Sequence, residues 1–159
     1  MAGSELYFAY GNNMAEATMR GRIGEGHHLF LGVARLDGFR LTFTTETPEW
    51  GGPVADLTEE EGSAVYGVLY EVDQVAWKRL APHEPTYIHR RVPVRLLVPS
   101  ALSSHEAGDV LEVTIYFVPD EDKLPEQAAE PRYLARIMAA AIERGLPATH
   151  LDAIRFAGA

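Results

Sequence analysis

The sequence predicts an α+β fold, a small mixed or antiparallel β-barrel with helices packed outside it. Strand-like segments mostly follow one another along the chain instead of alternating with long helices, which favours antiparallel or mixed pairing. The strongest helical pattern comes after the last of these segments. Because the 159 residues contain no repeat, linker or low-complexity stretch, we expect a single domain over residues 1–159.

The N-terminal segment is expected to be a buried strand that ends in a turn. Residues 6–10 are apolar and aromatic, and Gly11, Asn12 and Asn13 follow them directly. Asn13 is a good N-cap residue, so we expect it to begin a helix at Met14.

The rest of the chain is expected to add several strands and two further helices. A turn at Asp37-Gly38 is predicted to join two strands into a hairpin. Pro93 predicts an edge position for its strand, and Asp73 is predicted to cap a short helix. Gly145 is predicted to end a long helix. The expected strands are 29–36, 39–45, 54–57, 64–72, 91–98 and 111–118, with a solvated turn at 58–62, helices at 74–80 and 131–144, and a last helical turn or two from His150.

Composition excludes several classes of function. The chain has 14 Lys and Arg against 23 Asp and Glu, a net charge of −9, which disfavours nucleic-acid binding. It has no Cys, so disulfides, thiol catalysis and thiolate metal sites are excluded. No apolar run approaches the ~20 residues of a membrane span, and the first residues lack a signal-peptide pattern. We therefore expect a cytoplasmic protein with no membrane partner.

Three segments together resemble the γ-glutamylcyclotransferase family. Residues 7–14 read Y-F-A-Y-G-N-N-M, and residues 65–72 read V-Y-G-V-L-Y-E-V before a short helix and a glutamate. Pro131, Tyr133 and a Gly-Leu-Pro turn at 145–147 recur in the same order near the C-terminal end, and residues 51–57 look like the family's glycine-bearing strand. The resemblance spans nearly the whole chain.

The resemblance implies a reaction that needs no cofactor and no metal. A small-molecule γ-glutamyl amide attacks its own γ-carbonyl with its α-amine and releases 5-oxoproline and a free amine. Because the nucleophile belongs to the substrate, one carboxylate acting as general acid and base is sufficient. The Y-G-N-N-M loop is closer to relatives that act on γ-glutamyl amino acids or dipeptides. The oligomeric state stays open between monomer and homodimer.

Glu84 is the candidate catalytic residue, because it follows the short helix where the family places its glutamate. Pro82 and Pro85 stiffen this segment, and partial burial would raise the pKa of the carboxyl towards neutrality. A solvent-facing loop glutamate is the alternative reading from composition alone.

The candidate substrate-binding residues are Tyr10, Gly11, Asn12, Asn13 and Tyr116. A strand that ends in a glycine turn and enters a helix exposes backbone N–H groups beside a positive helix end, which suits a carboxylate or an oxyanion. Tyr116 matches a family tyrosine near the substrate, although a core aromatic fits equally well. We expect Tyr133 to pack in the core, with contact to the pocket as the alternative, and Trp50 either to line the pocket or to cap the core. The six histidines show no metal-ligand spacing, so no metal site is expected.

Two departures from the family pattern leave other functions open. Asn12 replaces the family's usual serine, and Pro85 rather than glycine follows Glu84, so no residue from 86 to 91 is assigned a role. The alternatives are a lyase of specialised metabolism that removes a γ-glutamyl group, and a non-catalytic ligand-binding domain on the same fold.

Overall fold

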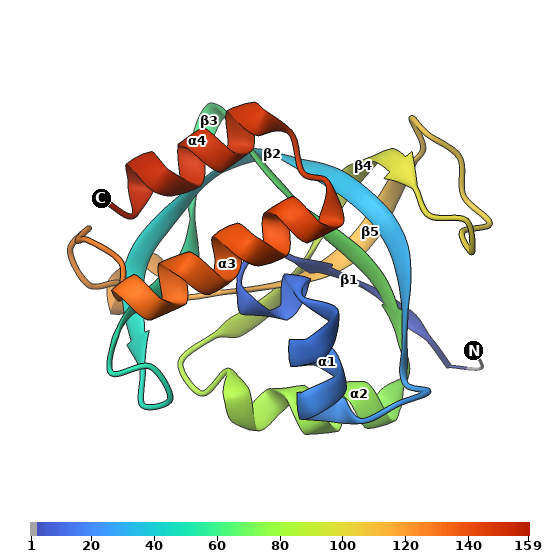
Figure 1. Ribbon diagram of the computed structural model, residues 1–159, viewed down its shortest axis with the longest axis horizontal. Helices are drawn as coiled ribbons and strands as arrows, with labels where there is room; N and C mark the ends of the chain where they lie inside the picture. Colours follow the sequence, from blue (N-terminus) through green and yellow to red (C-terminus); the bar gives the residue numbers. More distant parts are fainter. Residues whose placement is uncertain (1–2) are drawn as a thin grey trace.

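A closed barrel of strands forms the centre of the protein, and the helices lie on its outside (Figure 1). The computed structural model describes residues 3–159. The strands neighbour one another in the order β1-β3-β2-β4-β5. β1 and β5 close the barrel in parallel, and the other pairs are antiparallel, so the predicted mixed barrel is confirmed. The strands are β1 (Glu5–Ala9), β2 (His28–Thr47), β3 (Gly52–Val72), β4 (Ile88–Pro99) and β5 (Val110–Phe117).

The helices are short in the first half of the chain and longer at its C-terminal end. α3 and α4 lie against one side of the barrel, and α1 and α2 lie near one of its ends (Figure 1). The α-helices are α1 (Glu16–Ile23), α2 (Gln74–Leu80), α3 (Pro131–Arg144) and α4 (Ala148–Ala157), and the 3-10 helices are η1 (Asn12–Met14), η2 (Ala81–His83) and η3 (Asp120–Asp122).

β2 and β3 form one long hairpin, and this corrects the turns predicted inside them. Asp37 pairs with Ala64 and Phe39 pairs with Glu59, so residue 38 lies opposite residues 60–63 in an irregular stretch. The glycines at 38 and 62 have φ angles of +85° and +86° there. Turn-forming residues therefore produce a bulge where both strands bend, because glycine adopts these angles freely. Predicted strands on either side of the bulge merge, which lowers the strand number from the expected six or seven to five among residues 3–159.

The expected N-cap role of Asn13 is wrong. Asn13 lies inside η1, and α1 starts only at Glu16 with Ala15 as an N-cap that makes no side-chain hydrogen bond. The Asn13 amide instead donates to the hydroxyl of Tyr7 over 2.9 Å. Buried polar partners across the barrel end outweigh the local capping bond that the sequence pattern offers.

Other local predictions are confirmed. The Asp73 carboxylate accepts a hydrogen bond from the Ala76 N–H over 3.0 Å and caps α2. Gly145 ends α3 in the left-handed conformation, with φ 79° and ψ 32°. Pro93 lies in the half of β4 that pairs with β5 alone, since pairing with β2 begins at Arg95. The C-terminal helix α4 is longer than the turn or two expected.

The loop after β1 is held against the barrel by close packing and by hydrogen bonds. A Cβ at Gly67 would stand 2.5 Å from the carbonyl oxygen of Ala9, so β3 and β1 approach closely there. The Tyr70 hydroxyl lies 2.9 Å from the carbonyl oxygen of Asn13 and 2.8 Å from that of Met14. Arg144 of α3 donates to the same Met14 oxygen over 2.9 Å. Barrel and α3 together fix the position of this loop.

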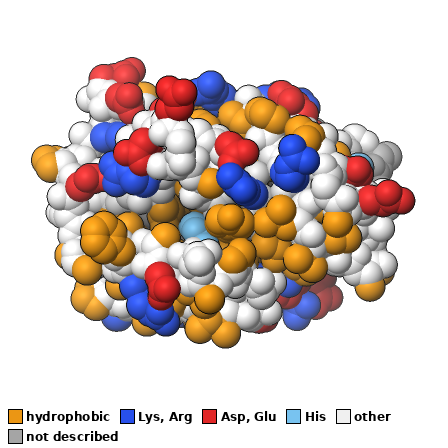
Figure 2. All heavy atoms as spheres, turned by 90° about the horizontal axis from the view of Figure 1, so that it is seen from above, with side chains coloured by type: hydrophobic (Ala, Val, Ile, Leu, Met, Phe, Trp, Pro, Cys, Tyr) orange, Lys and Arg blue, Asp and Glu red, His pale blue; other side chains and the backbone are white. Residues whose placement is uncertain are grey.

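The outer surface mixes charged and apolar side chains. Viewed from the side of α4, acidic and basic groups are interspersed with apolar ones around a visible histidine (Figure 2). Phe156 of α4 is 87% exposed. Among the helices of residues 3–159, none has the length and apolar character needed to cross a membrane.

Candidate active site

A pocket opens where the loop after β1, the end of α2 and the start of α3 come together. It encloses about 450 Å³ of space that no atom fills, part of it open to solvent. All six residues predicted for the site, Tyr10, Gly11, Asn12, Asn13, Glu84 and Tyr116, line this pocket. The structure thus brings them together, while their roles stay predictions. The other lining residues are Tyr7, Arg22, Thr47, Glu49, Trp50, Val54, Ala55, His83, Tyr87 and Tyr133.

Glu84 follows η2 directly and points into the pocket wall formed by the loop after β1. Its side chain is 12% exposed. The Asn13 amide Nδ2 donates to Glu84 Oε1 over 3.2 Å, and Arg22 Nη1 lies 3.9 Å from the same oxygen. The carboxyl group is therefore held by one hydrogen bond and one longer ionic contact.

Burial raises the pKa of Glu84 from its usual value to about 7. The positive charge of Arg22 and the hydrogen bond from Asn13 act against this rise, and the negative charge of Glu49 adds to it. Arg22 is also shared, because it donates to Asn13 Oδ1 over 2.7 Å and to Glu49 Oε2 over 2.9 Å. Glu84 is consequently close to half ionised near neutral pH, where it can both accept and donate a proton.

Tyrosine hydroxyls surround the carboxyl group, and their hydrogen bonds distinguish them. Tyr10 donates to the backbone oxygen of Tyr116 over 2.5 Å, and Tyr87 donates to that of Ala55 over 2.6 Å. The Tyr116 hydroxyl has no such partner among residues 3–159. Burial, with a contribution from the charge of Glu84, raises the pKa of Tyr116 to about 12, so its phenol stays protonated at neutral pH. Tyr116 can therefore donate a hydrogen bond to a bound molecule.

The helix expected beside the substrate cradle is only a short 3-10 helix. η1 spans Asn12–Met14, and α1 begins beyond it at Glu16, so no α-helix N-terminus meets Gly11 directly. A macrodipole needs several aligned turns, and the predicted helix-end attraction for an anion is not supported here. Close packing explains the glycine better, because a Cβ at Gly11 would stand 2.6 Å from the Tyr133 hydroxyl oxygen.

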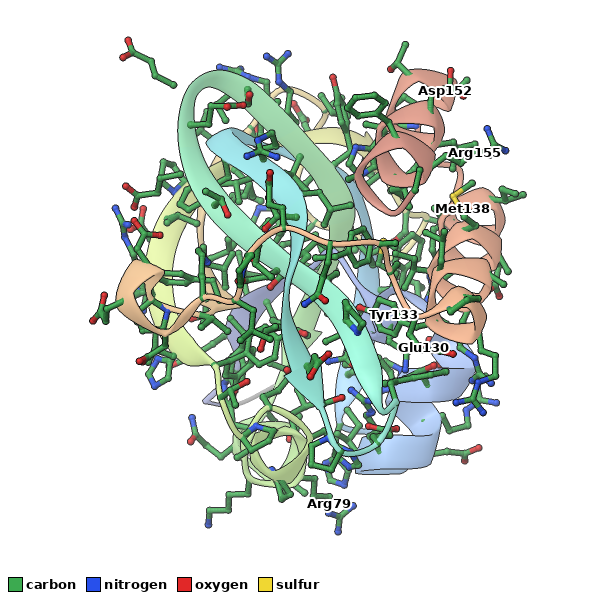
Figure 3. The ribbon with its side chains drawn as sticks, turned by 90° about the vertical axis from the view of Figure 1, so that its left-hand side faces the viewer. Arg79, Glu130, Tyr133, Met138, Asp152 and Arg155 are labelled. Carbon is green, nitrogen blue, oxygen red and sulfur yellow. The ribbon has the colours of Figure 1, made fainter. Side chains whose placement is uncertain are left out.

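Sequence reasoning missed several residues that line the pocket. Tyr133 packs in the core as expected, and it also lines the pocket, pointing from α3 towards the barrel (Figure 3). Trp50 lines the pocket and also packs against the core, so it occupies both of its expected positions. Arg22 gave no signal in the sequence, because it lies on a short helix without a motif. Tyr87 falls in the segment where the family register could not be followed.

The described residues 3–159 contain no group of three His, Asp or Glu side chains placed to hold a metal ion. His27 pairs with Asp73 over 2.8 Å, and His28 pairs with Glu16 over 2.8 Å, so these two adjacent histidines serve separate contacts. His83 lies 3.8 Å from Glu49 at the pocket rim.

Comparison with known proteins identifies the class of this fold and site. A family model for gamma-glutamyl cyclotransferase, AIG2-like proteins matches residues 7–135, and the chain belongs to that family. The gamma-glutamylcyclotransferase of Bos taurus is 31% identical over 150 residues, covering 91% of this chain and 73% of that protein. The human gamma-glutamylcyclotransferase is 27% identical over 158 residues, covering 96% of this chain and 78% of that protein.

Solved structures share the fold over nearly the whole chain. A gamma-glutamyl cyclotransferase superposes with a TM-score of 0.81 at 24% identity, covering 96% of this chain and 86% of that one. A yeast cyclotransferase specific to glutathione superposes with a TM-score of 0.58 at 17% identity, covering 97% of each chain. Both comparisons show that the fold is shared, with the first structure more similar than the second.

Proposed function

We propose that this protein is a γ-glutamylcyclotransferase that converts a γ-glutamyl amide to 5-oxoproline and a free amine, with Glu84 as its acid and base. The observation that carries the proposal is the environment of Glu84. Its carboxyl is nearly buried in a polar pocket, and its pKa is raised to about 7. A carboxyl group that gains and loses a proton near neutral pH fits a reaction that only relocates protons.

The reaction balances without water or any added group. The α-nitrogen of the substrate forms a bond to its own γ-carbon, and the bond from that carbon to the departing nitrogen breaks. The attacking nitrogen loses one proton to the Glu84 carboxylate, and the departing nitrogen takes that proton back. The free α-amine has a reference pKa of ~8, so its initial deprotonation at neutral pH costs only about 1.4 kcal/mol. Holding the γ-glutamyl group of the substrate in a curled conformation lowers the barrier to ring closure by more than this deprotonation cost.

Tyr116 is the residue we assign to the substrate carbonyl or carboxylate. Its hydroxyl is protonated at neutral pH and is not engaged by another described residue, whereas Tyr10 and Tyr87 donate to backbone oxygens. A neutral donor placed at a developing oxyanion stabilises the transition state more than the ground state. Gly11, Asn12 and Asn13 complete the cradle: Gly11 leaves room beside Tyr133, and Asn13 orients the Glu84 carboxyl.

The test is 5-oxoproline release from γ-glutamyl-L-alanine, γ-glutamyl-ethylamine and glutathione by the wild type and by Glu84→Gln. Removing the acid and base is expected to lower turnover by about 10²–10⁴-fold. Glu25→Gln is the matched control, because the Glu25 side chain is 82% exposed and pairs with Arg20 away from the pocket. Wild-type turnover in the folded Glu84→Gln protein would refute the assignment of the base, and a wild type inactive on all three compounds would refute the function.

A further inference from the structure

A second hollow adjoins the active-site pocket at its outer mouth. The two share five lining residues, which are Asn12, Arg22, Glu49, Trp50 and His83. The outer hollow then extends between α1 and α3, where Arg132 and Arg136 line it. A molecule that fills the inner pocket and is longer than a γ-glutamyl group can therefore extend into this arginine-lined space.

The outer hollow carries positive charge on a chain whose net charge is −9. Two of its arginines already have carboxylate partners, since Arg22 contacts Glu49 over 2.9 Å and Arg132 contacts Glu130 over 3.1 Å. Arg136 forms no ion pair with any residue from 3 to 159, and its side chain is exposed. An exposed guanidinium with free donors is well suited to a carboxylate.

Trp50 connects Arg136 to the inner pocket. The Arg136 guanidinium lies over the Trp50 ring, 5.6 Å from its centroid, and the Trp50 ring meets Tyr133 edge-to-face at 5.3 Å. Trp50 lines both the inner pocket and the outer hollow. These ring contacts place Arg136 beside the opening that the inner pocket shares with the outer hollow.

We propose that Arg136, with Arg132 beside it, binds the carboxylate of the departing amine, so that the protein prefers γ-glutamyl amino acids and peptides over γ-glutamyl amines. This inference rests on the proposed cyclotransferase function and names its substrate class. With the γ-glutamyl part curled at Glu84, an amino-acid leaving group points its carboxylate outward, where a simple amine has none. The arginines also disfavour a cationic leaving group by charge repulsion.

A different hollow lies on the other side of Glu84 and offers a weaker fit. It is lined by Glu84, Tyr87 and Tyr116 together with Lys78, but Glu5 also lines it. A carboxylate placed there would meet one cation and one additional anion. A Lys78 variant therefore distinguishes a leaving group that extends towards Lys78 from one that extends towards Arg136.

The experiment compares kcat/KM for γ-glutamyl-L-alanine with that for γ-glutamyl-ethylamine, which lacks only the carboxylate. The ratio of the two is expected to favour the alanine compound in the wild type and to fall as salt is raised, because the contact is ionic and exposed. Arg136→Gln is expected to lower the ratio by roughly two- to fivefold, Arg136→Lys by less. Arg155→Gln on α4 is the control, because Arg155 is 60% exposed and points away from the barrel (Figure 3).

The outcomes separate this inference from the proposed function. No 5-oxoproline from either compound or from glutathione would overturn the proposed function itself, and turnover of glutathione alone would overturn the inference. Turnover of both compounds with a ratio that Arg136→Gln leaves unchanged would overturn the inference alone. A ratio that falls in Lys78→Gln and not in Arg136→Gln would place the carboxylate on the other side of Glu84 and would also overturn it.

Discussion

Replacing Arg22 with glutamine is expected to raise the pKa of Glu84 and move the acidic limb of the pH–rate profile to higher pH. Arg22 Nη1 lies 3.9 Å from Glu84 Oε1, and its positive charge favours the ionised carboxylate. Glutamine removes that charge while keeping a polar group next to Asn13. The carboxylate then becomes harder to form, and the base form of the enzyme appears only at higher pH.

The size of the shift follows from Coulomb's law at this distance. Two unit charges 3.9 Å apart interact by about 1 kcal/mol in water and by about 4 kcal/mol at an effective dielectric constant of ~20. At ~1.4 kcal/mol per unit, these limits correspond to roughly 0.8 and 3 pKa units. Arg22 also contacts Glu49 over 2.9 Å, and that carboxylate offsets part of its charge. We therefore expect a shift near the lower limit, about one unit.

The assay is kcat/KM for γ-glutamyl-L-alanine measured across pH. The substrate ammonium, with a pKa of ~8, titrates identically with every variant, so a difference between variants belongs to the enzyme. Arg20→Gln on the same helix is the control, because Arg20 is 56% exposed and pairs with Glu16 and Glu25. A lower affinity for the alanine carboxylate would reduce kcat/KM at every pH without moving the limb. A limb that stays in place or moves to lower pH would refute the electrostatic role of Arg22.

Three further predictions concern stability and packing. Because the folded protein holds the Glu84 proton more tightly than the unfolded chain, whose reference pKa is 4.5, stability falls as pH rises from about 4.5 to 7. Glu84→Gln should remove this loss, so denaturant titration should find it roughly 3 kcal/mol more stable than wild type at pH 8 and no different at pH 4. Lys123→Met should cost about 3–5 kcal/mol in the same assay, because it strips the counter-charge, 2.7 Å away, from the fully buried Asp56; a loss below 1 kcal/mol would contradict this reading. Gly11→Ala should destabilise the protein by about 1–3 kcal/mol through overpacking against the Tyr133 hydroxyl, and the melting temperature should fall accordingly. Adding Tyr133→Phe should restore part of this stability. An unaltered melting temperature in Gly11→Ala would show that the loop accommodates the added methyl group and would contradict the prediction.

Local chemistry along the chain was sufficient to predict much of the fold. Asp73 and Gly145 mark helix ends because a cap depends on residues next to it in sequence. The turn at Asp37-Gly38 failed for the opposite reason. Whether a glycine with positive φ reverses the chain or bends a continuing strand depends on the partner strand, and β3 supplies a matching irregularity at residues 60–63. That information is not local.

The residues of the candidate site also differ in whether the sequence alone could predict them. Glu84 and residues 10–13 were found because the family resemblance fixes their order along the chain. Arg22 was not found, because its contact with Glu84 joins α1 to the end of α2 and depends on how those helices pack. Tyr87 lies in the segment after Pro85, where the spacing differs from the family pattern. Its position in the pocket follows from the hydrogen bond to Ala55 on β3.

Neutral hydroxyl groups, rather than further charges, make up much of the surroundings of Glu84. Burial raises the pKa values of the lining residues Tyr7, Tyr10, Tyr87 and Tyr116, so they remain uncharged at neutral pH and add polarity only. The burial effect on Glu84 therefore outweighs the opposing charge of Arg22, which Glu49 already shares. A second unpaired cation beside Glu84 would lower the pKa of the carboxyl and make the carboxylate a weaker base for the proton transfer proposed for it. For this reaction, the pocket benefits from one shared arginine and a wall of protonated phenols.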